Sequence, residues 1–126
     1  MTIAESEDFV TRHWPTEIRV GADRRSLTVG FDGGEQVEIA AELLRVESPS
    51  AEVQGHSAAG KQVVAGKGGV TIASVEPVGN YAIRIGFDDG HATGLYTWRY
   101  LYKLGTEGDR LMAAYLSELE AKGLSR

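Results

Sequence analysis

Histidine and carboxylate side chains are the strongest candidates for chemistry in this sequence. The histidines are His13, His56 and His91, and no two of them are four residues apart, so the paired-histidine helix of a metalloprotease is excluded. His91 directly follows a turn that contains Asp88 and Asp89. If the long segment around His56 folds back on this turn, imidazoles and carboxylates converge as ligands for a metal that prefers nitrogen and oxygen. We therefore take His91, His56, Asp88 and Asp89 as a candidate site for zinc or iron, with ordinary turn chemistry as the alternative.

Cysteine chemistry and phosphate binding by a P-loop are both excluded, because the sequence lacks the residues that they need. The chain has no Cys, which excludes thiol nucleophiles, cysteine-held iron-sulfur clusters and the usual tetrahedral structural zinc. The segment 66–70 (GKGGV) is similar to the opening of a phosphate-binding loop, but Thr71 and Ile72 follow it where a second Gly-Lys with Ser or Thr is needed. We expect a glycine turn between two strands at this place.

Hydroxyl and aromatic side chains give weaker signals. There is no G-x-S-x-G motif, and Ser48, Ser50 and Ser57 have no base that the sequence identifies. Four aromatic residues lie close together in the chain, but no basic stripe accompanies them, so core packing explains them better than stacking on nucleic-acid bases. These residues are Tyr96, Trp98, Tyr100 and Tyr102.

Length and charge limit the class of protein. A chain of 126 residues forms one small domain, and its net charge of −5 argues against binding to nucleic acid or an anionic membrane. Residues 1–10 contain three acids where a signal peptide has a basic start, and no run approaches the ~20 apolar residues of a membrane span. We expect a cytoplasmic protein that binds neither nucleic acid nor membrane.

Alternating apolar residues predict two similar hairpin units. The first unit has strands around Ile18, Leu27 to Phe31 and Val37 to Ile39, a turn at 32–34 and a short helix at 40–45. The same pattern returns 56 residues later, where Ile83 to Phe87 lead to a turn at 88–90 and a helical segment at 98–104. Between the units we expect a long loop over 47–69, with a short strand at 62–65, and then a strand from Val70 to Val75.

The last element has the pattern of an amphipathic helix. Thr106 precedes Asp109 by three residues, as at a helix start, and Gly123 is a plausible stop. Apolar residues at helical spacing form one stripe, which packs on the domain or forms the seam of a dimer. The predicted organisation is a lead-in over 1–14, a domain over 15–105 and this helix over 106–126. The predicted fold is α+β, a two-layer sandwich of a mainly antiparallel sheet with short helices, built from the two hairpin-plus-helix units.

Two long strings of residues carry a family resemblance. The segments 44–56 (LRVESPSAEVQGH) and 76–91 (EPVGNYAIRIGFDDGH) resemble the gamma-butyrobetaine hydroxylase-like N-terminal domain, in the stand-alone bacterial form. The similarity runs from about Pro15 to Gly105. It implies a small α+β domain, which in larger relatives precedes an iron and 2-oxoglutarate dioxygenase domain or follows a Mrp-type ATPase that carries iron-sulfur clusters.

The resemblance also implies a zinc site, of which this sequence keeps one ligand. In the hydroxylases a Cys-x-Cys-x-x-Cys run and a later His bind zinc, and these positions fall here at Ser48, Ser50, Val53 and His91. Serine is a poor zinc ligand and valine is none, so the usual site cannot form from these residues. The iron ligands of the dioxygenase belong to a separate domain, for which this chain has no room.

The sequence leaves two classes of function open. We expect a non-catalytic accessory or protein-interaction domain, associated with iron-sulfur or metal handling, whose partner is an iron-sulfur assembly or ATPase component. The alternative is a metal-binding protein that uses His91 and His56 with nearby carboxylates, or a component of a 2-oxoglutarate oxygenase-type system. The oligomeric state is open between a monomer and a weak homodimer.

Overall fold

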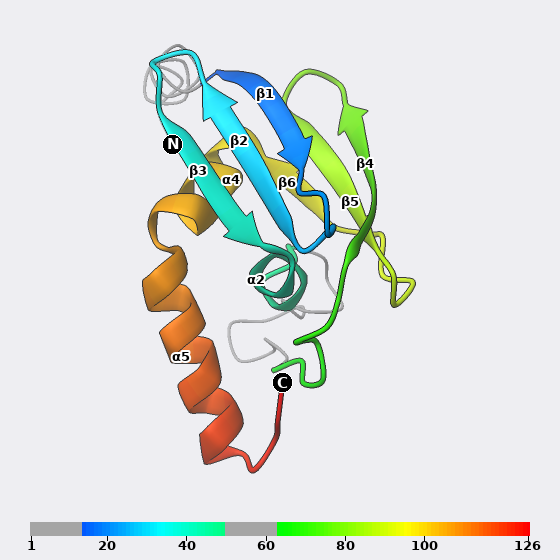
Figure 1. The fold of residues 1–126 in the computed structure, drawn as a ribbon, viewed down its shortest axis with the longest axis vertical. Helices are drawn as coiled ribbons and strands as arrows, with labels where there is room; N and C mark the ends of the chain where they lie inside the picture. The colour runs from blue at the N-terminus through cyan, green and yellow to red at the C-terminus, as the bar shows by residue number, and fades with distance from the viewer. Residues whose placement is uncertain (1–13, 50–62) are drawn as a thin grey trace.

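The computed structural model describes residues 14–49 and 63–126, and Figure 1 shows how their elements are arranged. The predicted lead-in, except Trp14, and His13 and His56 lie outside these ranges. The first half contains β1 (Pro15–Val20), β2 (Ser26–Phe31), β3 (Gln36–Ala40) and α2 (Ala41–Val46). The second half contains β4 (Ile72–Val78), β5 (Ala82–Phe87), β6 (Leu95–Thr97), α4 (Trp98–Thr106) and α5 (Gly108–Ala121).

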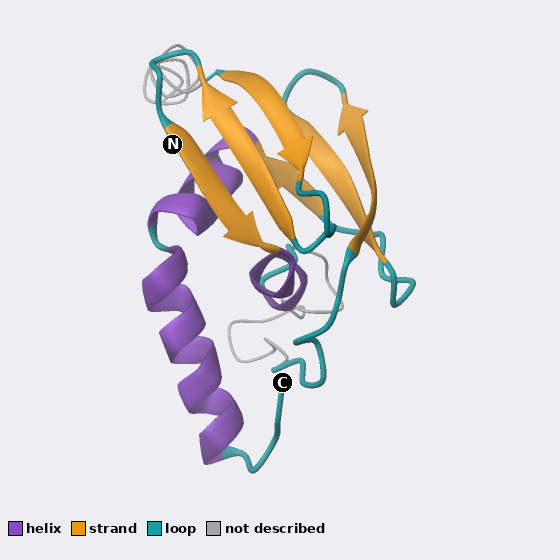
Figure 2. Cartoon of the chain, in the orientation of Figure 1, coloured by secondary structure: helices purple, strands orange, loops and turns teal. Residues whose placement is uncertain are grey.

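The strands form two antiparallel sheets of three strands each in the described part of the chain, in the orders β1-β2-β3 and β4-β5-β6. The register pairs Val29 with Ile18 and Val37 in the first sheet, and Ile85 with Val75 in the second. A helix follows the third strand of each sheet, as Figure 2 shows. The prediction of an α+β fold is confirmed, and the single sheet that we expected is divided into two.

The two hairpin turns have the same geometry. Phe31 N–H donates to Glu35 O at 2.8 Å, and Phe87 N–H donates to His91 O at 2.9 Å. The glycine in each turn has a φ angle near +90°, a conformation that glycine adopts without steric cost. The equivalence of the two units therefore extends from residue identities to backbone hydrogen bonds, and it places His91 directly after the second turn.

The side chain and backbone of Arg24 join the two sheets. Ile72 N–H donates to Arg24 O at 2.8 Å, while Arg24 Nε donates to Ile72 O at 2.6 Å and its Nη2 donates to Ala73 O at 2.8 Å. Arg24 has a φ angle of +62°, so its backbone adopts the left-handed region to make this contact. The turn between β1 and β2 is thus fixed to the start of β4.

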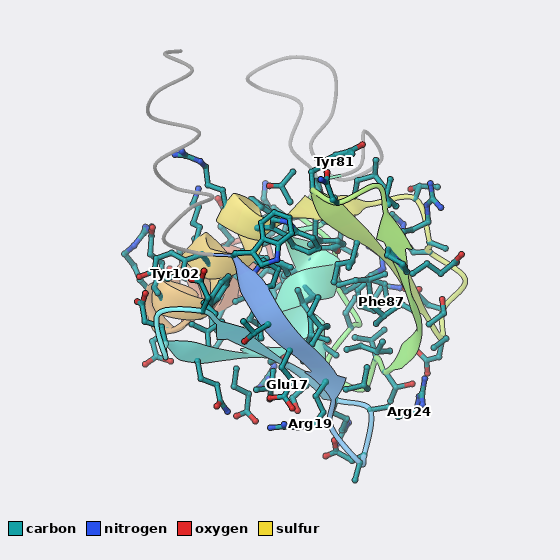
Figure 3. All side chains as sticks on the ribbon, turned by 90° about the horizontal axis from the view of Figure 1, so that it is seen from above. Glu17, Arg19, Arg24, Tyr81, Phe87 and Tyr102 are labelled. Carbon is teal, nitrogen blue, oxygen red and sulfur yellow. The ribbon has the colours of Figure 1, made fainter. Side chains whose placement is uncertain are left out.

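The apolar face predicted for the hairpins is the core of the molecule. Val29, Phe31, Ile83, Ile85 and Phe87 are all buried. Figure 3 shows Phe87 between the two sheets, whereas Glu17 and Arg19 lie on the outer surface of β1. Large apolar residues are buried at every second position of β2 and β5, which explains why a hydrophobic period of two is visible in the sequence.

Helix α5 packs on its own chain. Tyr115 and Leu119 are buried in the core, and Tyr115 Oη donates to Val64 O at 2.5 Å. The helix ends as predicted before Gly123, whose φ angle is +67°, and Leu124 N–H returns to Leu119 O at 2.8 Å. Intramolecular docking, one of the two predicted uses of the stripe, is therefore present, and the oligomeric state stays a prediction.

The tail after α5 fixes this helix to α2 and the glycine segment. Arg126 donates to both carboxylate oxygens of Glu42, at 2.5 and 3.1 Å. Glu42 is buried, and Gly66 N–H donates to Ser125 O at 2.9 Å. The buried carboxylate of α2 thus has a cationic partner from the end of the sequence.

Two local predictions are wrong. Thr106 does not start the last helix but ends α4, where its hydroxyl donates back to Tyr102 O at 2.8 Å, and α5 begins at Gly108 without a side-chain cap. Residues 63–65 do not form the expected strand, and residue 62 lies outside the described ranges. Val63 and Val64 instead pack against the core as irregular backbone.

Across the two described ranges, none of the helices has the length and apolar character that crossing a membrane requires.

Candidate functional site

A buried pair of polar side chains lies where the two hairpin units meet. Ser48 Oγ and His91 Nε2 are 3.1 Å apart and form a hydrogen bond whose donor depends on the histidine tautomer. The exposed fractions of these residues are 0% and 7%. Ser48 follows the end of α2, and a Cβ atom at Gly94 would lie 2.5 Å from its hydroxyl, so glycine at 94 permits this close approach. The serine is inaccessible to a substrate and is not placed as a nucleophile.

Asp89 is the centre of an ion-pair network beside this pair. Its Oδ2 accepts from Arg45 Nε at 2.8 Å and from Lys67 Nζ at 2.6 Å, and its Oδ1 accepts from His91 N–H at 3.0 Å. Partial burial raises the pKa of Asp89, but the hydrogen bonds from Lys67, the His91 backbone and Arg45 outweigh this effect and lower the pKa far below its ordinary value. Asp89 is therefore an ionised structural anchor that binds the backbone of His91.

Asp88 is oriented toward the start of β4. Thr71 N–H donates to Asp88 Oδ1 at 3.0 Å, and Asp88 N–H donates to Thr71 O at 3.0 Å. This reciprocal pair connects the turn to the segment that precedes β4. The two acids of the turn thus hold different segments of the backbone.

Three of the four aromatic residues donate to backbone carbonyls, and the fourth, Tyr102, packs against the core, in agreement with the prediction of core packing. Tyr96 Oη donates to Leu44 O at 2.6 Å, Tyr100 Oη donates to Glu47 O at 2.5 Å, and Trp98 Nε1 donates to Asn80 O at 2.9 Å. Burial raises the pKa of Tyr100 to about 12, with a further contribution from the charge of Glu47. Tyr96 and Tyr100 therefore hold the end of α2 and the residue after it as neutral phenols.

The described residues do not fit the structural zinc that the resemblance implies. Such a site needs four strong ligands, usually thiolates and imidazoles. His91 Nε2 is instead used in a hydrogen bond with the hydroxyl of Ser48. The guanidinium of Arg45 binds Asp89 through Nε, and its buried Nη1 has no hydrogen-bond partner among the described residues. Its positive charge opposes a metal cation there. Over residues 14–49 and 63–126, no three His, Cys, Asp or Glu side chains are grouped so that they could hold a metal ion.

The predicted site residues are only partly placed by the structure. His91 and Asp89 are in contact, through the backbone of His91, and Asp88 points to Thr71. His56 lies outside the described residues, so the candidate site that includes it stays a prediction. Sequence reasoning from the residues missed Arg45 and Lys67. It also predicted no partner for Ser48. The resemblance did contain a signal, because it places Ser48 and His91 at ligand positions of one metal and therefore close together.

Comparison with solved structures gives several similar proteins, and three of them are described here. Two solution structures determined by NMR are 45% and 44% identical to this chain, each with a TM-score of 0.78. They cover 91% and 90% of this chain, and the matches cover 90% and 85% of those proteins. This coverage is larger than residues 1–105 alone could supply, so the similarity extends into the C-terminal helix.

The third similar structure is a crystal structure from Acidithiobacillus ferrooxidans, described as a protein of unknown function of the DUF971 family. It is 39% identical, has a TM-score of 0.61, and covers 73% of this chain and 92% of its own. No curated protein matches the chain. The family model described as gamma-butyrobetaine hydroxylase-like, N-terminal, matches residues 18–102. The chain therefore belongs to the gamma-butyrobetaine hydroxylase-like N-terminal family.

Proposed function

We propose that this chain is a non-catalytic accessory domain that binds a protein partner. The observation that carries the proposal is that three polar side chains of the described part of the chain, Ser48, Asp89 and His91, are used in internal bonds. Ser48 and His91 are buried against each other, and Asp89 is held by two cations and a backbone N–H. Side chains held in this way position the end of α2 and the turn after β5, and this structural use supports a role in binding rather than in catalysis.

The proposed partner is a Mrp-type ATPase that carries iron-sulfur clusters, in the cytoplasm. The support for this partner is the resemblance, because larger relatives join a domain of this family to such an ATPase in one chain. In those relatives the fusion holds the domain and the ATPase together. When the two are separate chains, they need a contact surface to associate. The role in iron-sulfur handling would then be to assist the ATPase, which itself holds the cluster.

The test of this proposal is the affinity of the purified chain for the Mrp-type ATPase of the same genome. We expect saturable binding with a Kd on the order of 1–10 μM, as for a transient interface, measured by calorimetry with the ATPase in its cluster-loaded and cluster-free forms. A small acidic protein of similar net charge serves as the control. Absence of binding to both forms at about 100 μM, or selective binding to a 2-oxoglutarate oxygenase domain, would contradict the proposal.

A further inference from the structure

The residues after α5 form a short strap on the surface of the domain. Residues 123–126, here called the strap, turn back from the end of the helix toward the segment that precedes β4, as Figure 1 shows. The chain turns at Gly123, whose φ angle of +67° lies in the left-handed region that glycine adopts without steric cost. Gly123 is therefore suited to act as a hinge between α5 and the strap.

The strap contacts both neighbours of Lys67. Gly66 N–H donates to Ser125 O at 2.9 Å. On the other side, a Cβ atom at Gly68 would lie 3.2 Å from the Cβ of Arg126, so the strap packs closely on this glycine. Lys67 Nζ is part of the ion-pair network described above, at 2.6 Å from its carboxylate. The strap thus holds the backbone from which Lys67 reaches the network.

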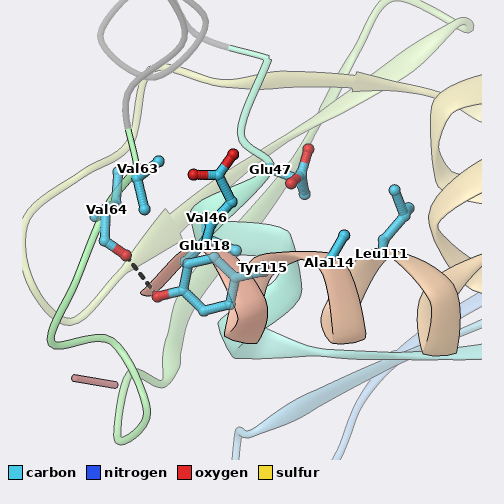
Figure 4. A pocket seen from close by; sticks show the side chains of 8 residues that line it. All are labelled: Val46, Glu47, Val63, Val64, Leu111, Ala114, Tyr115 and Glu118. Atoms are coloured by element: carbon cyan, nitrogen blue, oxygen red, sulfur yellow. Dashed lines mark hydrogen bonds between the residues drawn. The ribbon is translucent and has the colours of Figure 1, made fainter. Parts of the chain in front are cut away.

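Helix α5 is held in place by contacts that do not involve the strap. Tyr115 and Leu119 are buried in the core. At the wall of a pocket of about 200 Å³, Tyr115 Oη donates to Val64 O, the bond drawn as a dashed line in Figure 4. This bond fixes the backbone before the glycine segment 66–69, and Val70 after it is buried. The strap and the glycine segment are therefore free to separate while α5 and the sheets stay in place.

Polar contacts at the surface hold the strap closed. Leu124 is 43% exposed, the side chain of Arg126 is 55% exposed, and the strap contributes no residue to the core formed by the described residues. Arg126 is instead bonded to both carboxylate oxygens of the buried Glu42. Segments with few buried apolar contacts open at a lower free energy than the core. Opening the strap therefore costs less free energy than unfolding the domain.

We propose that the strap opens as a unit about Gly123 while the domain stays folded, and that its opening frees Lys67 from the ion-pair network. In the open state Gly66 and Gly68 lose the contacts that fix them, so the segment that carries Lys67 moves and its amine exchanges the carboxylate of Asp89 for water. A partner that binds the open strap better than the closed one shifts the population toward the open state. This inference concerns a motion of the chain itself, and it goes beyond the proposed function and does not depend on it.

Native-state hydrogen exchange of the full-length wild-type protein tests the opening. The amides of Gly66 and Leu124 report on the strap, and the amide of Val29, in the central strand of the first sheet, reports on global unfolding. After correction for intrinsic rates, we expect Gly66 and Leu124 to exchange equally fast, at least about tenfold faster than Val29, and with little dependence on urea. Exchange of Gly66 only together with Val29, or at an opening free energy different from that of Leu124, would overturn the proposal.

Matched arginine variants test what holds the strap closed. Arg126→Gln removes the charge that binds Glu42, Arg126→Lys keeps the charge without the planar fork, and Arg110→Gln removes an exposed arginine of α5 outside the strap. We expect exchange at Gly66 to be at least about tenfold faster in Arg126→Gln, intermediate in Arg126→Lys and within about twofold of wild type in Arg110→Gln. An unchanged exchange rate of Gly66 in Arg126→Gln would contradict the proposal.

The reactivity of Lys67 tests the link to the ion-pair network. Brief acetylation with acetic anhydride, read by mass spectrometry, measures the accessibility of its amine, and Lys103, an exposed lysine of α4, is the internal reference. We expect the ratio of Lys67 to Lys103 acetylation to rise at least about fivefold in Arg126→Gln and to stay unchanged in Arg110→Gln, because an amine bonded to a carboxylate is shielded from the reagent. Faster exchange at Gly66 without a rise in this ratio would show that the strap opens without freeing Lys67, and the proposal would be wrong.

Discussion

Replacing Phe87 by alanine is expected to lower the free energy of unfolding by about 3–5 kcal/mol, because removal of a buried ring leaves a cavity that the surrounding residues do not fill. Phe87 is 3% exposed and lies at the end of β5, where its backbone closes the second hairpin turn. Its ring centroid is 6.4 Å from that of His91, so the cavity would also loosen the buried Ser48–His91 pair.

Urea denaturation at neutral pH measures the effect on Phe87. Tyr81→Ala is the matched control, because Tyr81 is an aromatic residue just before the same strand and is 51% exposed. That substitution should change the free energy of unfolding by no more than about 0.5 kcal/mol. An unchanged midpoint for Phe87→Ala would show that the ring is not part of the core.

Replacing Asp89 by asparagine is expected to cost about 2–3 kcal/mol at pH 7, because it leaves the charges of Arg45 and Lys67 without their counter-ion. The pKa of Asp89 is lower in the folded protein than in the unfolded chain. The stabilisation is therefore fully present above the unfolded pKa of about 3.9 and is lost as the pH falls below it toward the folded pKa.

The pH dependence distinguishes Asp89 from an ordinary surface acid. The urea midpoint of unfolding of the parent protein should fall steeply between about pH 4 and pH 2. The difference in urea midpoint between the parent and Asp89→Asn should shrink over the same range. The control is Asp32→Asn, which alters the corresponding turn of the first hairpin. A constant difference between parent and Asp89→Asn from pH 7 to pH 2 would contradict the ion-pair network.

The sequence predicted the strands well because their large apolar residues lie at every second position. Ile83, Ile85 and Phe87 are buried in the core while Arg84 is exposed, and the residue types alone show this contrast. The division into two sheets was not visible, because it depends on hydrogen bonds between strands and on Arg24, which docks one turn onto the other sheet. Local alternation does not specify such contacts over 48 residues.

The errors at helix ends have a local cause. A hydroxyl three residues before a carboxylate is typical of a helix start, but Thr106 satisfies a carbonyl of the preceding helix instead. The two helices follow each other with only Glu107 between them, so one threonine had two possible roles. The actual side-chain cap is at Thr97, which accepts from Tyr100 N–H at 3.2 Å and starts α4.

The candidate site was predictable only through the resemblance. Ser48 and His91 are 43 residues apart, and Arg45 and Asp89 are 44 apart, so no local pattern connects them. The alignment with the zinc ligands of relatives brings the first pair together, and it says nothing of the second. In this chain Ser48 and His91, which the resemblance places at two zinc-ligand positions, form a hydrogen bond, and Asp89 beside them is paired with Arg45 and Lys67.

The claim that this polar cluster holds the fold without a metal is tested most directly by calorimetric titration. Zinc and ferrous ions are titrated into full-length protein purified without an affinity tag and treated with a chelator, and the unfolding midpoint is measured before and after the chelator. His56→Ala and His91→Gln are the variants, since either would remove a ligand in the alternative metal site. We expect no binding tighter than about 1 μM and no change in the midpoint on chelation, because one buried imidazole beside two cations supplies too few ligands. Sub-micromolar binding that either variant abolishes, with the folded state retained, would contradict this account.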